Sequence, residues 1–274
     1  MRNYIQMGKF MLLAMVAIGL ASCSSPVTSL TGAVENAVIG EASGSGEPES
    51  RGKETFEADA FDSIRVAAEA MEIFVTRGTG DSAEAELLVD DTIKSRFSFE
   101  AKIKSRALVI DVEEKEPSGL FNKGVQEGER KLLISLPDKT YDEVKIESSF
   151  GIVAASDLNS DKLDIQVDAG TIRLNQVTGE MTLKTNAGDI EVEGLKLERD
   201  LSASADVGEI RIRLDEAPEA AEIDLRTDVG EATAELSDID YSKNAANEKV
   251  GTIGSKGARI EAHTSVGAVR VDTE

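Results

Sequence analysis

The C-terminal half of the chain repeats one pattern of apolar and polar positions. Residues 163–174 read LDIQVDAGTIRL, and residues 181–192 read MTLKTNAGDIEV. Each copy alternates apolar and polar residues, reaches a glycine, and alternates again over a shorter run. Alternation with a period of two predicts strands with one buried and one solvated face. Self-similarity at a short, fixed period is typical of a repeat architecture.

Further copies align on other glycines at spacings of roughly 16 to 22 residues. Apolar residues recur five positions before the glycine, immediately before it and two positions after it, so we predict that all three positions face the interior. The candidate turn glycines are Gly151, Gly170, Gly188, Gly208, Gly230 and Gly267, with Gly251 as a further candidate. The residues immediately before them are Phe150, Ala169, Ala187, Val207, Val229 and Val266, with Val250 before Gly251.

The parity of the apolar positions changes at each glycine, from odd offsets before it to even offsets after it. In a flat strand, a slip of one residue moves side chains to the opposite face. The chain must therefore bulge or turn a corner there, and glycine suits a corner because it adopts positive φ without steric cost. A strand bent once per repeat around an apolar interior predicts an all-β fold, a β-helix or β-solenoid-like stack.

The predicted domain covers residues 55–274. Residues 141–274 form the regular repeats, and residues 55–140 alternate less regularly, as expected for atypical first coils or a cap of the same solenoid. Residues 23–54 are rich in Ser, Gly, Ala, Thr and Glu, which predicts a disordered tether. Within it, Val34 to Ile39 is compatible with a short helical turn.

Residues 1–22 have the layout of an export signal. Arg2 and Lys9 supply positive charge, and Phe10 to Leu20 is an apolar run too short to cross a bilayer as a helix. The motif Leu20-Ala-Ser-Cys23 resembles the lipobox of bacterial lipoproteins. That resemblance implies that Cys23 is lipidated and becomes the new N-terminus; the alternative is an ordinary secretory signal.

Cys23 is the only cysteine, so no internal disulfide is available. Three acyl chains, as the lipoprotein resemblance implies, would anchor the protein stably, whereas a single chain binds membranes only marginally. Ser24 stands where an Asp would signal inner-membrane retention in Gram-negative bacteria. The prediction is a cell-envelope protein, held at the outer membrane if the organism is Gram-negative.

The formal net charge is −22. Removal of residues 1–22 lowers the Lys and Arg count from 30 to 28 against 52 acids, which gives about −24. Such a charge argues against nucleic acid as a partner and disfavours a polyanionic substrate. Because aromatic residues are only 4% of the chain and Trp is absent, the core must consist of Ile, Leu, Val and Ala.

Several motifs resemble an exported bacterial family of β-strand-repeat proteins known as "putative adhesins". They are LLISLP at residues 132–137, ESSFGIV at 147–153, DAGTIRL at 168–174, NAGDIEVEGL at 186–195 and DVGEIRI at 206–212. The resemblance extends over residues 55–274. It implies an export signal or membrane anchor followed by one β-helix-like domain, and it provides no catalytic residues.

Oxygen-bearing residues recur two positions before the glycines. They are Asp168, Asn186, Asp206 and Asp228, flanked by Ser149 and Ser265, with Lys249 in the copy at Gly251. Stacked coils would place them about 4.8 Å apart. One interpretation is a Ca²⁺ ladder with ligands from adjacent coils. The favoured alternative is local, because Asp and Asn before Gly form turns and Asn ladders stack well.

The remaining chemistry is sparse. His263 is the only histidine and falls at an outward position, so it is expected to be a solvated surface residue. No G-x-S-x-G nucleophile motif is present. The sequence therefore predicts no enzyme and no cofactor.

The predicted function is that of a lipid-anchored, non-catalytic envelope module that presents a long β-face to a protein or glycan. An accessory role in an envelope-stress or signalling system is the alternative. A polysaccharide-active β-helix enzyme comes third, and would need a groove with converging acids and a basic residue.

Overall fold

The computed structural model describes residues 48–91, 93–115 and 129–273, and these are almost entirely strands. Two 3₁₀ turns, Ala58–Ala60 and Lys94–Arg96, are the only helical elements in these ranges. Neither could cross a bilayer, and the described residues contain no other candidate span. The predicted all-β, solenoid-like fold is confirmed.

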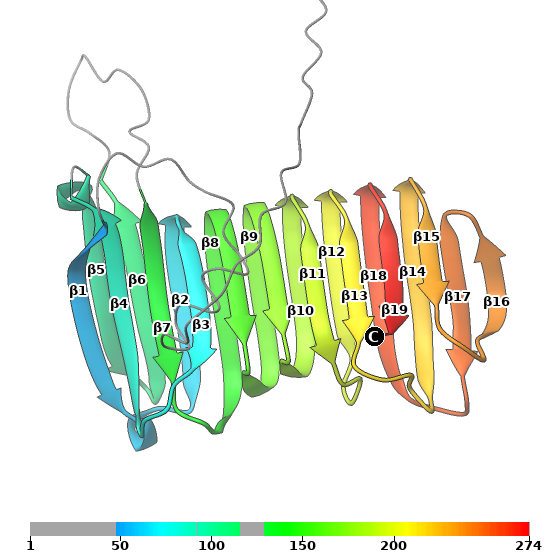
Figure 1. Ribbon diagram of the computed structural model, residues 1–274, viewed down its shortest axis with the longest axis horizontal. Helices are drawn as coiled ribbons and strands as arrows, with labels where there is room; N and C mark the ends of the chain where they lie inside the picture. The colour runs from blue at the N-terminus through cyan, green and yellow to red at the C-terminus, as the bar shows by residue number, and fades with distance from the viewer. Residues whose placement is uncertain (1–47, 92, 116–128, 274) are drawn as a thin grey trace, which may run out of the picture. The chain divides into compact units, whose positions relative to one another are not determined.

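Six coils form the regular part, and each bends at a glycine (Figure 1). In two of the coils a single strand continues around the bend. In the other four coils the bend separates two strands. The coils are β8 (Thr140–Ser156), β9 (Asn159–Asn175), β10 (Thr178–Ala187) with β11 (Ile190–Leu195), β12 (Leu201–Val207) with β13 (Ile210–Leu214), β14 (Ala221–Val229) with β15 (Ala232–Glu235), and β18 (Ala258–Val266) with β19 (Val269–Thr273).

The limbs before the glycines form a first parallel sheet, and the limbs after them form a second. In the first sheet Leu163 pairs with Met181, which pairs with Leu201. In the second sheet Ile172 pairs with Ile190, which pairs with Ile210. Equivalent repeat positions are thus in register from coil to coil.

The coils are not stacked in sequence order. The last coil, β18–β19, lies between β12–β13 and β14–β15, because Ile260 pairs with Leu201 on one side and Ile223 on the other (Figure 1). A stack in chain order, which the sequence interpretation assumed for the Asp and Asn residues, is therefore wrong at this point.

The copy proposed around Gly251 is also wrong. Gly251 lies inside β17 (Glu248–Ile253), which pairs antiparallel with β14 and with β16 (Asp240–Ala245). Its partners are Ile223 and Tyr241, and it is not among the glycines with positive φ. Residues 240–253 form an antiparallel hairpin that extends the first sheet beyond β14. They are therefore not part of the parallel repeat.

The first part of the domain joins the same stack. Its strands are β1 (Pro48–Glu57), β2 (Ser63–Ala70), β3 (Glu72–Arg77), β4 (Ser82–Asp90), β5 (Phe97–Lys104), β6 (Ala107–Glu114) and β7 (Arg130–Leu136). β2 and β3 form an atypical coil with Met71 at the bend, and both pair in parallel with β8. β5–β6 extend the first sheet, while β7, β4 and β1 extend the second.

The predicted tether ends earlier than expected. Residues 48–54, assigned to it, belong to β1 and pair antiparallel with β4. Their side chains are mostly exposed, so they lack the apolar alternation that identifies a half-buried strand, and backbone pairing alone defines them. The signal segment, Cys23 and the tether up to residue 47 lie outside the described residues.

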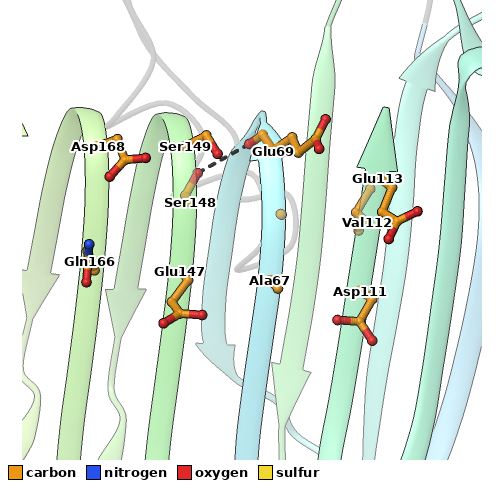
Figure 2. A pocket seen from close by; sticks show the side chains of 11 residues that line it. Ala67, Glu69, Asp111, Val112, Glu113, Glu147, Ser148, Ser149, Gln166 and Asp168 are labelled. Atoms are coloured by element: carbon orange, nitrogen blue, oxygen red, sulfur yellow. Dashed lines mark hydrogen bonds between the residues drawn. The ribbon is translucent and has the colours of Figure 1, made fainter. Parts of the chain in front are cut away.

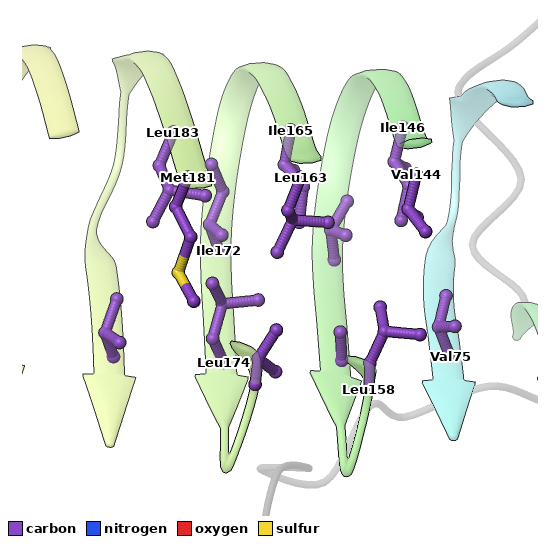
Figure 3. Packing of buried hydrophobic residues seen from close by; sticks show 14 of the residues in the cluster. Val75, Val144, Ile146, Leu158, Leu163, Ile165, Ile172, Leu174, Met181 and Leu183 are labelled. Atoms are coloured by element: carbon purple, nitrogen blue, oxygen red, sulfur yellow. The ribbon is translucent and has the colours of Figure 1, made fainter. Parts of the chain in front are cut away.

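The interior is a narrow, mostly aliphatic core between the two sheets. The prediction that it consists of Ile, Leu, Val and Ala alone is wrong, because Phe61, Phe97 and Tyr141 are also fully buried. Val144, Ile146, Leu163 and Ile165 face Ile172 and Leu174 in adjacent coils, each at most 2% exposed (Figure 3). Burying a side chain of this size stabilises the fold by about 1.5–3 kcal/mol. Similar apolar layers in successive coils thus hold the corner and both outer faces in a fixed register.

Candidate functional site: the glycine corner

The six predicted turn glycines all have positive φ, between +122° and +150°. They also stack closely on one another. A Cβ on Gly170 would lie 1.8 Å from the carbonyl oxygen of Gly151, and a Cβ on Gly188 would lie 1.8 Å from that of Gly170. No side chain fits at either position, so glycine is required by conformation and by space together.

Buried hydroxyls support the same corner from inside. Three positions before the glycine stand Thr185, Thr227 and Thr264, each at most 3% exposed. Thr227 Oγ1 donates to the Gly267 carbonyl at 2.9 Å, and Thr264 Oγ1 donates to the Gly208 carbonyl at 3.0 Å. The interior side chain therefore also carries a hydrogen bond to the bend of the neighbouring coil.

Replacing Thr264 with Val should lower stability by about 1 kcal/mol, because the shape is kept while a buried hydrogen bond is lost. The measurement is the urea midpoint at constant m-value. Thr182→Val, on the outward side of β10, is the matched control and should change stability by less than about 0.5 kcal/mol. Equal midpoints for the two variants would contradict a supporting role for the hydroxyl.

The residues two positions before the glycines form one outward row, here called the acid–neutral row. In spatial order it reads Ser149, Asp168, Asn186, Asp206, Ser265 and Asp228. Asn186 Nδ2 donates to Asp168 Oδ1 at 3.4 Å. Insertion of the last coil places Ser265 between Asp206 and Asp228, so no two carboxylates in the row occupy neighbouring coils.

This order weakens the calcium interpretation. Asp206 and Asp228 do not share a step of the stack, and carboxylates two coils apart are about 9.6 Å apart, too far to bind one Ca²⁺ at 2.3–2.6 Å each. Lys249 lies in β17 and is not part of the row. No group of three His, Cys, Asp or Glu suited to a metal ion occurs within the described ranges. The alternation of acidic and neutral residues along the row keeps the carboxylates of neighbouring coils apart.

His263 lies on the outward face of β18, beside this row. Its Nε2 is 3.5 Å from Asp228 Oδ1, and its side chain is 45% exposed. This is a solvated surface position.

An exposed apolar row runs beside the acid–neutral row. Its members are the residues immediately before the glycines, in spatial order Phe150, Ala169, Ala187, Val207, Val266 and Val229, here called the apolar ridge. Phe150 is 61% exposed, Val207 54%, Val266 46% and Val229 64%. The prediction that these positions face the interior is wrong, because the bend already begins there and the side chains emerge on its convex side.

The first sheet also carries an acidic hollow of about 390 Å³ (Figure 2). It opens where Ala67 of β2 stands between Asp111 of β6 and Glu147 of β8. The carboxylates that line it are those of Glu69, Asp111, Glu113, Glu147 and Asp168, and none of the described residues around it is Lys, Arg or His. The small side chain at Ala67 produces the hollow, and the surrounding acids make it strongly negative.

Arginines paired with acids lie on the outer face of the second sheet. Arg173 and Arg211 both bind Glu191 at 2.9 Å, and Arg213 binds Asp272 at 3.1 Å. Such exposed pairs contribute little stability each. Their effect on the surface is to neutralise acidic side chains of this face.

Residues 140–272 match the model of the family described as Toastrack DUF4097. No curated protein matches the sequence. The chain is similar to the crystal structure of a "putative cell adhesion protein" from Clostridium sporogenes ATCC 15579, at 12% identity and a TM-score of 0.51, covering 83% of this chain and 100% of that one. It is also similar to a "putative adhesin" from Bacteroides fragilis NCTC 9343, at 18% identity and a TM-score of 0.42, covering 80% and 95% of the two chains.

At 12% identity the Clostridium structure shows a shared fold and nothing finer. The match of residues 140–272 to the Toastrack model, together with the shared fold, confirms the predicted resemblance of the chain to the β-strand-repeat family of putative adhesins.

Proposed function

We propose that this protein is a lipid-anchored, non-catalytic binding module of the cell envelope, and that a partner docks along the apolar ridge. The observation that carries the proposal is the ridge itself. Four large apolar side chains are 46–64% exposed on one line of the stack. Exposed apolar surface that forms one continuous feature marks interaction sites more often than scattered exposed residues do.

The chemistry of the corner describes the partner. An apolar line beside Asp168, Asp206 and Asp228 favours a ligand with apolar groups at regular intervals and with positive or hydrogen-bonding groups next to them. A protein segment in extended form meets this requirement, because it presents side chains on one face at regular intervals of about 6.7 Å, with backbone hydrogen-bonding groups between them. The names of the Clostridium and Bacteroides proteins agree with an adhesive role.

The enzyme alternative has less support. Among the described residues that line the acidic hollow, none is the basic residue that polysaccharide cleavage on this type of fold would need. A second hollow, of about 350 Å³, does contain Arg259 beside Glu222 and Asp224. The hydrogen bond and charge of Glu222 raise the pKa of Arg259, so this guanidinium remains a cation and does not serve as a base.

The test for the anchor is fractionation of cells that express the full chain. The wild-type protein should sediment with the membranes, in the outer membrane for a Gram-negative host. Cys23→Ser should release it or block its maturation. Equal membrane association of wild type and Cys23→Ser would refute lipid anchoring. It would not bear on docking at the ridge.

The test for the ridge is separate. A host that lacks the gene is complemented with wild type, with Val207→Ser/Val266→Ser/Val229→Ser, or with the control Thr182→Ser/Lys184→Ser/Glu261→Ser on the flat outer face of the first sheet. Binding of the cells to immobilised envelopes should fall about tenfold or more for the ridge variant alone, since exposed anchors at an interface carry most of the affinity. Loss in the control, or in neither, would overturn docking at the ridge.

A further inference from the structure

The spacing of the apolar ridge limits the kind of partner that fits it. The ridge residues pair in register from each coil to the next. Neighbouring members are therefore about 4.8 Å apart, and the five steps from Phe150 to Val229 give a length of about 24 Å. The side chains on one face of an extended segment repeat about every 6.7 Å, so they lose register with the ridge within two coils. A partner that stays in register along the whole ridge needs the same 4.8 Å repeat.

The sizes of the ridge side chains are complementary to the same ridge turned end for end. Along the stack the order is Phe150, Ala169, Ala187, Val207, Val266 and Val229. If a second copy lies antiparallel against the first, Ala169 faces Val266 of the other copy and Ala187 faces its Val207. Each small side chain thus meets a larger one, as close packing requires. Two copies in the same direction would instead place Ala against Ala at two adjacent coils and leave gaps there.

The acid–neutral row is complementary in the same arrangement. A two-fold axis across the ridge brings row against row, and the facing pairs are Ser149 with Asp228, Asp168 with Ser265, and Asn186 with Asp206. Every carboxylate then meets a hydroxyl or an amide that can donate a hydrogen bond to it. A shift by one coil would place Asp168 opposite Asp206 in one direction and opposite Asp228 in the other. Charge therefore selects the register that the ridge sizes also favour.

On the other side of the ridge, the same arrangement brings Asp189 of one copy towards Glu209 of the other. Both carboxylates are already bound within their own chain. Asp189 Oδ1 accepts the backbone N–H of Glu209 at 2.8 Å, and the Glu209 carboxylate binds the Arg211 guanidinium. Their charge is therefore partly compensated before the copies meet, and this side of the ridge does not oppose the pairing that the acid–neutral row favours.

We infer that the partner at the apolar ridge is a second copy of this chain, docked antiparallel in that register. The inference rests on the proposed docking at the ridge and names its partner. β1 extends the second sheet at one end of the stack, so the two chains enter their domains at opposite ends of the pair. That orientation suits copies anchored in two envelopes that face each other.

A single pair of this kind is expected to be weak. The contact is about 24 Å long and only a few side chains wide, which is less than the about 1,200 Å² that stable complexes bury. Many anchored copies on each envelope would act together, and their combined binding exceeds that of one pair without any new contact. A test in solution must therefore trap short-lived pairs, which a disulfide across the interface does.

The cross-linking experiment uses the chain from residue 23 with Cys23→Ser, which removes the only cysteine. Phe150→Cys is mixed with tagged Val229→Cys under mild oxidation, and the mixed disulfide should exceed the Phe150→Cys homodimer at least about tenfold. Facing thiols can be bridged, whereas the two copies of position 150 would lie about 24 Å apart, beyond the about 7 Å between Cα atoms that a disulfide tolerates. Phe150→Cys homodimers as abundant as the mixed disulfide would overturn the antiparallel arrangement.

Charge tests the register. Ser149→Asp/Ser265→Asp in both cysteine variants should lower the mixed disulfide about tenfold, because it places Asp opposite Asp. Thr182→Asp/Ser202→Asp adds the same charge on the flat outer face of the first sheet and should not lower it. Circular dichroism confirms that each variant retains its strands. A mixed disulfide that survives the first pair of substitutions in a folded protein, or that both pairs lower equally, would overturn the register.

A cell assay separates this inference from the proposed function. Cells that carry the wild-type protein should bind immobilised envelopes that also carry it at least about tenfold better than envelopes from cells that lack the gene. Equal binding to the two envelopes, lost in Val207→Ser/Val266→Ser/Val229→Ser, would overturn the second copy as partner and leave docking at the ridge standing. Binding that this ridge variant retains would overturn both.

Discussion

Replacing Gly188 with Ala is expected to abolish cooperative folding of the domain. The residue has φ +138°, and an added Cβ would lie 1.8 Å from the Gly170 carbonyl oxygen and 2.6 Å from its carbon. Both atoms are backbone, so the clash cannot be relieved by a side-chain rotation. Separation of the two coils would disrupt the strand pairing of β9 with β10 and β11 on both sides of the bend. The cost should exceed about 4 kcal/mol, a large part of the 5–15 kcal/mol by which domains are stable.

Thermal unfolding followed by circular dichroism measures this effect. The matched control is Gly80→Ala in the turn between β3 and β4, where a Cβ would meet nothing within 4 Å. The control should match wild type or be slightly more stable, because Ala reduces the entropy of the unfolded chain. A Gly188→Ala protein that melts cooperatively within a few degrees of wild type would show that the corner can relax, and would contradict a steric requirement for glycine.

The corner was predictable from sequence because its cause is local. A change of parity at a glycine forces a bend, and all six of the turn glycines that the structure places at a corner have the positive φ that the pattern predicted. The apolar ridge was not predictable in the same way. Hydrophobicity at Val207 or Val229 suggests burial, and only the geometry of the bend reveals that the side chain points outward. In this fold, an apolar residue immediately before a corner glycine therefore lies on the surface.

The order of the coils was hidden for a different reason. Each coil offers its neighbours almost the same apolar limb and the same glycine, so local pattern does not specify which coil stacks on which. The hairpin of β16 and β17 pairs antiparallel with β14, and this closes one side of that coil. The last coil then pairs with the other side of β14 and with β12. This long-range pairing places Asp206 and Asp228 two coils apart, which is too far for both carboxylates to bind one Ca²⁺.

The coil order makes a second large prediction. Ile260, 0% exposed in the last coil, packs between Leu201 and Ile223, and the strand pairing of β14–β17 reaches the rest of the stack only through β18 and β19. Ile260→Asp should therefore release not only residues 258–273 but also residues 221–253, because a buried, unpaired carboxylate opens the coil on both sides. In hydrogen exchange, amides of β14 and β17 should lose at least about tenfold protection, while those of β8 and β9 keep theirs.

The same substitution at Ile239 provides the control, because chain order and spatial order then make opposite predictions. Ile239 is partly buried just before β16, at the spatial end of the stack, although it precedes Ile260 in sequence. Ile239→Asp should open the terminal hairpin alone and leave β18–β19 protected. In a solenoid whose repeats interact only with neighbours, a defect spreads to whatever depends on it for attachment. If Ile260→Asp frayed only residues 258–273, while Ile239→Asp released β18 and β19, the coils would be stacked in chain order and the arrangement described above would be refuted.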